Sequence, residues 1–272
     1  MNPWFYFALA IIGLVLAVWI PHWRLKRAIA APFPAEWARL LEDNILVYRR
    51  LPMPLRQQLR RLIKQFLHPV HFTGAAGLEI DDEIRVTIAA EACMLVLNRH
   101  TGVYPGLRYI IVYPTTFVVD REEYDEAGVV EYGPQEMLGE SWQEGKVILA
   151  WDAVQHGSRN FADGRNVVLH EFAHQLDAEF GGHDGAPLLG GAHSYRAWAE
   201  VLSGEFEDLQ ERSRRGKPSL MDEYGATHPA EFFAVATETF FEKPRQMAKY
   251  HAELFEVLLA YYRIDPRDWL SD

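Results

Sequence analysis

The sequence predicts a mixed α and β fold, on two kinds of pattern. Several long segments repeat apolar residues at helical spacing, and short runs rich in β-branched residues are bounded by turn residues. The helical segments are 36–48, 54–67, 78–97, 166–180, 195–211, 229–241 and 254–262. The strand-like runs are 109–113, 117–119 and 147–151. These patterns alone predict no finer class than mixed α and β.

Length and composition restrict the classes of function. A chain of 272 residues, 49% of them hydrophobic, can bury one sizeable core. The formal net charge of -11 opposes binding to a phosphate backbone, so nucleic acid is excluded as a partner. Cys93 is the single cysteine and is predicted to be a buried, inert thiol. Any metal must therefore be bound by His, Asp or Glu.

The N-terminal segment is predicted to anchor the chain in a membrane. Residues 3–20 carry no charge and approach the roughly 20 residues that cross a bilayer. Aromatic residues lie near both ends, and Arg24, Lys26 and Arg27 follow. Because positive charges follow the segment and none precedes it, it is predicted to be a single-pass anchor in the inner (cytoplasmic) membrane, with the remainder of the chain in the cytoplasm. A cleaved signal peptide or a buried core helix are the alternatives.

The chain is predicted to divide at the end of this segment. Residues 1–30 would form the anchor and its basic flank, and Pro32 and Pro34 then favour a short extended linker. Residues 31–272 would form one domain, which begins with two accessory helices within 31–70.

The motif H-E-F-A-H indicates a catalytic zinc site. Asn166 can cap a helix on which His170 and His174, four residues apart, share one face and can bind a single ion. Glu171 is turned away from that face but can reach a water molecule beside the metal, so it is the candidate general base. Two surface histidines on an ordinary helix are the alternative interpretation.

A catalytic zinc of this kind needs a third protein ligand. His183 and His193 lie in or just after a glycine-rich loop, where solvated or substrate-facing histidines are expected. Glu231 lies in a strongly apolar helix, where an unpaired carboxylate is costly. Glu238, seven residues later, shares that face and could bind the outer nitrogen of a ligand histidine, or lie on an exposed stripe.

Several segments together resemble the zinc peptidases similar to Mlc titration factor A, a gluzincin-type group. The resemblance covers about 34–266 and is carried by G-L-E-I-D-D-E-I-R-V-T-I-A-A, V-Y-P-T-T-F-V-V, G-E-S-W, N-V-V-L-H-E-F-A-H-Q-L-D and Y-G-A-T-H-P-A-E-F-F-A-V-A-T-E. It implies an α+β fold, with a zincin-like peptidase domain that has a small mixed sheet and an active-site helix, over residues 31–272. It also implies one Zn²⁺ per chain, with Glu231 as the third ligand beside His170 and His174.

The same resemblance implies further features of the site. Through the related catalytic core of anthrax lethal factor, Tyr224 is expected to support the oxyanion of the reaction. In enteric members of the group, a histidine can approach the metal in a resting form, and Glu131 stands near that place here. The substrates implied are short peptides, cut from the amino end, with a link to sugar uptake. The enteric members are soluble, so their repressor partner is not carried over to this chain.

The sequence thus predicts water-mediated hydrolysis of peptide or protein substrates, with Glu171 and Tyr224 as catalytic residues. A rival function is a membrane-tethered regulatory module that binds a cytoplasmic partner and uses zinc mainly for structure. A third is hydrolysis of a non-peptide amide.

Overall fold

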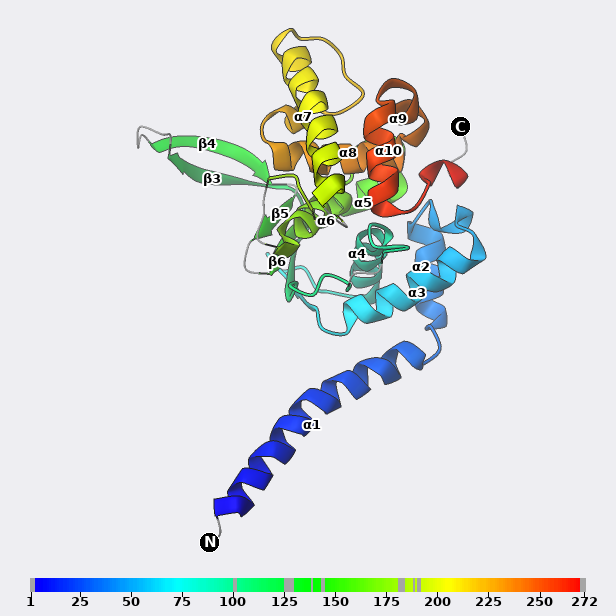
Figure 1. The fold of residues 1–272 in the computed structure, drawn as a ribbon, viewed down its shortest axis with the longest axis vertical. Coiled ribbons are helices and arrows are strands. Elements are labelled where there is room, and N and C mark those ends of the chain that lie inside the picture. Colours follow the sequence, from blue (N-terminus) through cyan, green and yellow to red (C-terminus); the bar gives the residue numbers. More distant parts are fainter. Residues whose placement is uncertain are drawn as a thin grey trace.

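The computed structural model of the chain describes residues 3–99, 102–124, 130–137, 139–142, 145–180, 184–187, 189 and 192–269. In these ranges helices pack around a small sheet, while the N-terminal helix and a β-hairpin project from the body (Figure 1). The predicted combination of α and β structure is therefore confirmed.

The central sheet is mixed. Within the described residues it has four strands in the order β1-β2-β6-β5, namely β1 (His71–Gly74), β2 (Tyr109–Tyr113), β6 (Lys146–Ala150) and β5 (Gly139–Trp142). The first three are parallel, whereas β5 runs antiparallel to β6 at one edge. The predicted runs 109–113 and 147–151 correspond to β2 and β6, and β1 and β5 were not predicted. Alternate residues of β2 and β6 are buried in the core.

The projecting hairpin consists of β3 (Phe117–Tyr124) and β4 (Val130–Met137), which pair antiparallel along their full lengths (Figure 1). The predicted run 117–119 is the start of β3.

Helices form most of the described chain. After the N-terminal helix they are α2 (Ala35–Asn44), α3 (Met53–Leu67), α4 (Asp82–Met94), α5 (Trp151–Arg159), α6 (Val167–Asp177), α7 (Ala192–Arg214), α8 (Pro229–Glu242), α9 (Pro244–Tyr250) and α10 (Ala252–Tyr262). Single 3₁₀ turns are η1 (Tyr48–Arg50), η2 (Ala178–Phe180), η3 (Glu223–Ala226) and η4 (Pro266–Asp268). Each segment predicted as helical overlaps one of these helices, while α5 and α9 were not predicted.

Side chains at the helix starts explain the boundaries. Asp81 accepts a hydrogen bond from the backbone N–H of Ile84, so α4 begins at residue 82 rather than at the predicted 78. Asn166 caps α6 in the same way, as the sequence predicted. Pro229 occupies the first turn of α8, where a missing N–H costs nothing.

The N-terminal helix α1 (Pro3–Ala30) contains Pro21 and continues through the basic residues that were predicted to flank a membrane span. Lys64 of α3 donates hydrogen bonds to the backbone oxygens of Ile29 and Ala31, which ties the end of α1 to the body. Among the helices in the described ranges, none is both long enough and apolar enough to span a bilayer. The predicted membrane anchor therefore has no support, and the division at residue 30 stays a prediction.

Helix α6 lies in the centre of the core. Its Phe172 is fully buried. The centroid of the Phe172 ring is 5.6 Å from that of Phe66 in α3 and 4.8 Å from that of Tyr104. On other sides α6 contacts α4, α5, α8 and the strands β5 and β6. This packing fixes the helix that carries the H-E-F-A-H motif.

Candidate metal centre

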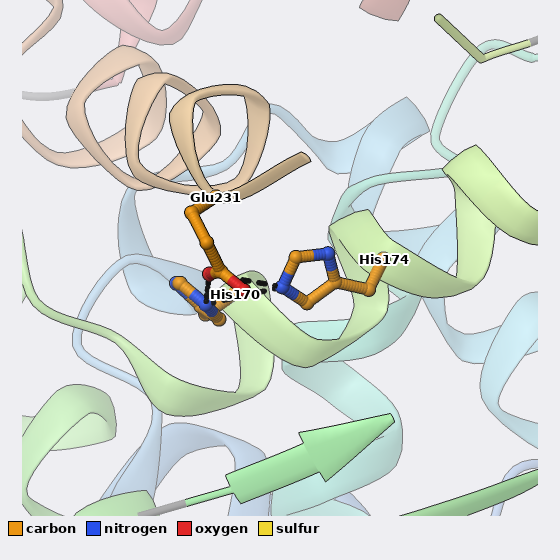
Figure 2. A group of neighbouring side chains, drawn as sticks. All are labelled: His170, His174 and Glu231. Carbon is orange, nitrogen blue, oxygen red and sulfur yellow. Dashed lines mark hydrogen bonds and ion pairs between the residues drawn. The ribbon is translucent and has the colours of Figure 1, made fainter. Parts of the chain in front are cut away.

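Two histidines and a glutamate from two packed helices point toward one place (Figure 2). His170 and His174 lie one turn apart on α6, and Glu231 lies in the first turn of α8. Glu231 Oε2 is 3.0 Å from His170 Nε2 and 3.3 Å from His174 Nε2, and the two Nε2 atoms are 3.2 Å apart. Within the part of the chain that the structure describes, this is the one group of side chains spaced to hold a metal ion.

The spacing of these three atoms fits zinc. Ligand atoms about 2.1 Å from a tetrahedral zinc ion lie about 3.4 Å from one another. The observed separations of 3.0, 3.2 and 3.3 Å are close to that value. Two imidazoles and one carboxylate are also a usual ligand set for a zinc ion that keeps one position open for catalysis. The three residues therefore fit a catalytic zinc ion.

Glu238 orients the first histidine. Its Oε1 is 2.7 Å from His170 Nδ1, on the side of the ring away from Glu231. A carboxylate at Nδ1 favours the tautomer whose Nε2 lone pair is available to a metal. The structure thus places Glu238 against the outer nitrogen of His170, as the shared helix face predicted.

Charges in the cluster favour a cation between its members. Burial lowers the pKa of His170, but hydrogen bonds with Glu231 and Glu238 outweigh burial and raise that pKa well above its usual value. Burial raises the pKa of Glu231, but hydrogen bonds from His170 and His174 outweigh it and hold that pKa well below its usual range. Positive charge at this place is therefore stabilised by the carboxylates, whether a proton or a metal ion carries it.

A cleft of about 610 Å³ opens beside the cluster. His170, Glu171 and Glu238 lie along its wall, and Glu171 is only 4% exposed. The other polar lining residues are Thr116, Asp152, His156, Arg165, Asn166, Asp222 and Tyr224. A substrate in this cleft would therefore lie near Glu171 and the side chains of α5, of η3 and of the segments that precede β3 and α6.

Tyr224 lines the same cleft as His170. Its ring centroid is 6.0 Å from that of His170, and the residue is 45% exposed. Asp222 Oδ1 accepts a hydrogen bond from the backbone N–H of Tyr224, while its Oδ2 is 2.7 Å from Nη2 of Arg165. Asp222 thereby connects η3 to the residue just before the cap of α6.

Three further candidates cannot be placed. His183 lies outside the described residues, and the same holds for the side chains of His193 and Glu131. Their roles as ligand or as a removable plug stay predictions.

The sequence reasoning missed several polar residues around the site. Glu91 and Glu242 are buried, and Glu91 is the one acid in the apolar run of α4. An acid in an apolar helix needs a partner, and this is as true of Glu91 as of Glu231. Arg165 and Asp222 gave no comparable signal, because charged loop residues are common.

The chain is similar to known proteins over nearly its whole length. The model of a family described as glucose-regulated metallo-peptidase M90 matches residues 20–263. An uncharacterised protein of Synechocystis sp. is 38% identical over 261 residues, which cover 94% of this chain and 95% of that protein. Mlc titration factor A of Cronobacter sakazakii is 32% identical over 248 residues, 90% of this chain and 91% of the relative. The protein of the same name from Serratia proteamaculans is 31% identical over 237 residues, 85% and 88% of the two chains.

Proposed function

The chain belongs to the family of glucose-regulated metallo-peptidases M90, and we propose that it is a zinc-dependent peptidase that hydrolyses peptide bonds with water. The observation that carries the proposal is the convergence of His170, His174 and Glu231 beside a cleft that is lined by both His170 and Glu171. A zincin-like fold of residues 31–272 is part of this proposal.

In this proposal His170, His174 and Glu231 hold one zinc ion. When bound, a zinc ion lowers the pKa of a water molecule and polarises a carbonyl oxygen. Glu238 accepts a hydrogen bond from Nδ1 of His170 and keeps that ring turned toward the ion.

Glu171 is the general base. It follows His170 on α6, lines the cleft and is nearly buried, so its carboxylate meets the substrate in a place with little competing solvent. It takes a proton from the attacking water and delivers it to the leaving amine. Tyr224, which lines the same cleft close to His170, donates a hydrogen bond from its phenol to the oxyanion of the tetrahedral intermediate.

The charge of the cleft supports a narrower proposal, cleavage of short peptides from the amino end. Its lining includes the acids Asp152, Glu171, Asp222 and Glu238. The basic lining residues Arg165 and His156 are each paired with an aspartate. An excess of acid favours the ammonium group of a free amino terminus. A peptide with a free amino terminus should be cut faster than its acetylated form, and equal rates would contradict this narrower proposal.

A regulatory role is the second candidate, and the name of the relatives favours it. Proteins named Mlc titration factor A are about 30% identical to this chain over most of its length. The chain would then bind a regulatory protein and influence sugar uptake, with zinc mainly structural. A nearly buried Glu171 beside the ligand histidines argues for catalysis, because a structural zinc needs no general base.

The test compares the full-length wild type with Glu171→Gln and Glu231→Ala, by metal analysis and peptidase assay. Glu171→Gln should bind one zinc per chain and lose about 10²–10⁴-fold in kcat. Glu231→Ala should lose zinc itself. Glu253→Gln, at an exposed position of α10, is the matched control and should behave as wild type. Unchanged turnover of peptides by Glu171→Gln would contradict the mechanism. If the wild type hydrolyses small amides but no peptides, the protein is an amidase that acts on non-peptide substrates.

A further inference from the structure

Asn166 occupies a junction between the metal centre and the core. Its side-chain Oδ1 accepts a hydrogen bond from the N–H of Leu169, and its backbone oxygen accepts one from the N–H of His170. Its backbone N–H donates to Glu238 Oε2 at 2.5 Å. Its side-chain Nδ2 donates to Glu91 Oε1 at 3.0 Å. One residue therefore contacts a candidate ligand, the carboxylate that orients that ligand, and a buried acid of α4.

Glu91 is the end of this network that no role yet explains. It is fully buried among apolar residues of α4, and its Oε2 has no hydrogen-bond partner within the described residues. Burial raises the pKa of Glu91 to about 8, although the hydrogen bond from Asn166 opposes the rise. At neutral pH the carboxyl is therefore mostly protonated, and it serves Asn166 as a neutral acceptor.

The space around Asn166 is closely matched to its side chain. A Cβ atom on Gly157 of α5 would lie 2.9 Å from both Cγ and Nδ2 of Asn166, closer than real contacts allow. Helices α4 and α5 thus enclose the side-chain amide with Glu91 and Gly157, while Glu238 of α8 accepts the backbone N–H of the same residue. Because the amide cannot swing toward α5, its donor is directed to Glu91.

We propose that Glu91 is a positioning residue for the metal centre. By holding the side-chain amide of Asn166, it fixes the first turn of α6 and the carboxylate of Glu238, and through these it fixes the imidazole of His170. The inference rests on the proposed function, because it concerns a metal held at His170. Ligand histidines depend on the partners of their outer nitrogen, and here that partner is itself held from α4.

The test uses the full-length protein with substitutions of similar size. Glu91→Met removes the acceptor and keeps the length of the chain, whereas Glu91→Gln keeps a neutral acceptor for Asn166. Val86→Ala, at a fully buried position of α4, is the control for a general loss of packing. Zinc affinity is measured by competition with a chromophoric chelator, at a temperature where circular dichroism shows every variant folded. Exchange of the Leu169 and His170 amides is measured in the metal-free proteins.

Glu91→Met should weaken zinc binding about tenfold and speed exchange at both amides. Glu91→Gln should restore both properties to within about twofold of wild type, because it keeps the hydrogen-bond acceptor. Val86→Ala should lower the thermal midpoint and leave zinc affinity unchanged. Wild-type affinity and exchange in Glu91→Met, or equal damage from Glu91→Gln, would overturn the proposal.

Two further measurements distinguish a wrong role for Glu91 from misfolding of the variant and from a wild type that binds no zinc. If Glu91→Met does not fold, Asn166→Ser keeps a helix cap and the backbone N–H to Glu238 but loses the amide that Glu91 holds. Its zinc affinity should fall by a similar factor, and an unchanged value would overturn the proposal. If the wild type binds no zinc, the proposed function fails, while amide exchange in the metal-free Glu91 variants still decides whether Glu91 fixes α6.

Discussion

Glu238 Oε1 lies 2.7 Å from Nδ1 of His170, while Oε2 of the same carboxylate accepts the backbone N–H of Asn166. Both oxygens are thus used, and the side chain is only 8% exposed. One carboxylate of α8 therefore sets both the orientation of a candidate ligand and the position of the helix that carries it.

The first prediction follows from this double contact. Glu238→Gln has only one acceptor oxygen, so it must give up either His170 or the N–H of Asn166. Zinc affinity should fall about 10–100-fold, the usual cost of losing the partner of a ligand histidine. Chelator competition measures the change, with the exposed Glu253→Gln as control. Wild-type zinc affinity in Glu238→Gln would show that His170 is held by other contacts.

Helices and strands that have a clear apolar pattern and a turn residue or proline at their ends could be predicted from the sequence. Strand β2 coincides with its predicted range, and α3 and α8 differ by one residue at one end. Each has a strong apolar pattern and a proline or turn residue at its boundary. The elements that were missed have little local signal. The residues of β1, H-F-T-G, are exposed or half-buried, so the strand has no apolar pattern. Helix α5 follows β6 without a loop, so the apolar pattern of the strand continues into Trp151, the first residue of the helix.

The same distinction holds within the site. His170, Glu171 and His174 are predictable because four-residue spacing on one helix is a local property. The contact between Glu91 and Asn166 joins residues 75 positions apart, and it depends on how α4 packs against α6. A sequence pattern can show that Glu91 needs a partner, but only the packed structure identifies that partner.

The second prediction concerns pH and Glu242, which accepts the N–H of Gly164 just before the cap of α6. Burial, opposed by the hydrogen bond from Gly164, raises the pKa of Glu242 to about 9 from 4.5. Between these values the unfolded chain has released the proton that the folded chain keeps, so this group lowers the free energy of unfolding as pH rises. Its nearby acids Glu238, Asp163 and Glu91 act in the same direction on its pKa.

Glu242→Gln does not titrate and therefore lacks this pH dependence. The stability difference, variant minus wild type, should increase from pH 5.5 to 8.5, by at most about 1.4 kcal/mol per pH unit. Urea unfolding of the metal-free proteins at several pH values measures it. Parallel pH profiles for Glu242→Gln and wild type would mean that Glu242 is already ionised in the folded state.

The third prediction tests the space beside Asn166. Gly157→Ala would place a Cβ 2.9 Å from the amide, so the amide or α5 must move. Overpacking of this kind should lower the free energy of unfolding by about 1–3 kcal/mol and weaken zinc binding as well. Gly204→Ala in α7 is the matched control, because its Cβ meets no atom within 4 Å. It should be neutral or stabilising, as expected for alanine in place of glycine inside a helix. Wild-type zinc affinity in Gly157→Ala would show that the position of the Asn166 side chain does not affect the metal centre.

The last prediction concerns Tyr224, whose hydroxyl is the proposed hydrogen-bond donor to the oxyanion. Its backbone N–H is held by Asp222 and its ring lies 6.0 Å from that of His170, so removing the hydroxyl should leave the ring in place. Tyr224→Phe should reduce kcat about 100-fold, with KM and zinc affinity close to wild type, because the lost bond forms only in the transition state. Tyr250→Phe, at an exposed position of α9, is the control. A contact that is equally strong in the enzyme–substrate complex and in the transition state affects KM alone. A rise in KM with unchanged kcat would therefore show that Tyr224 binds the substrate and does not stabilise the oxyanion.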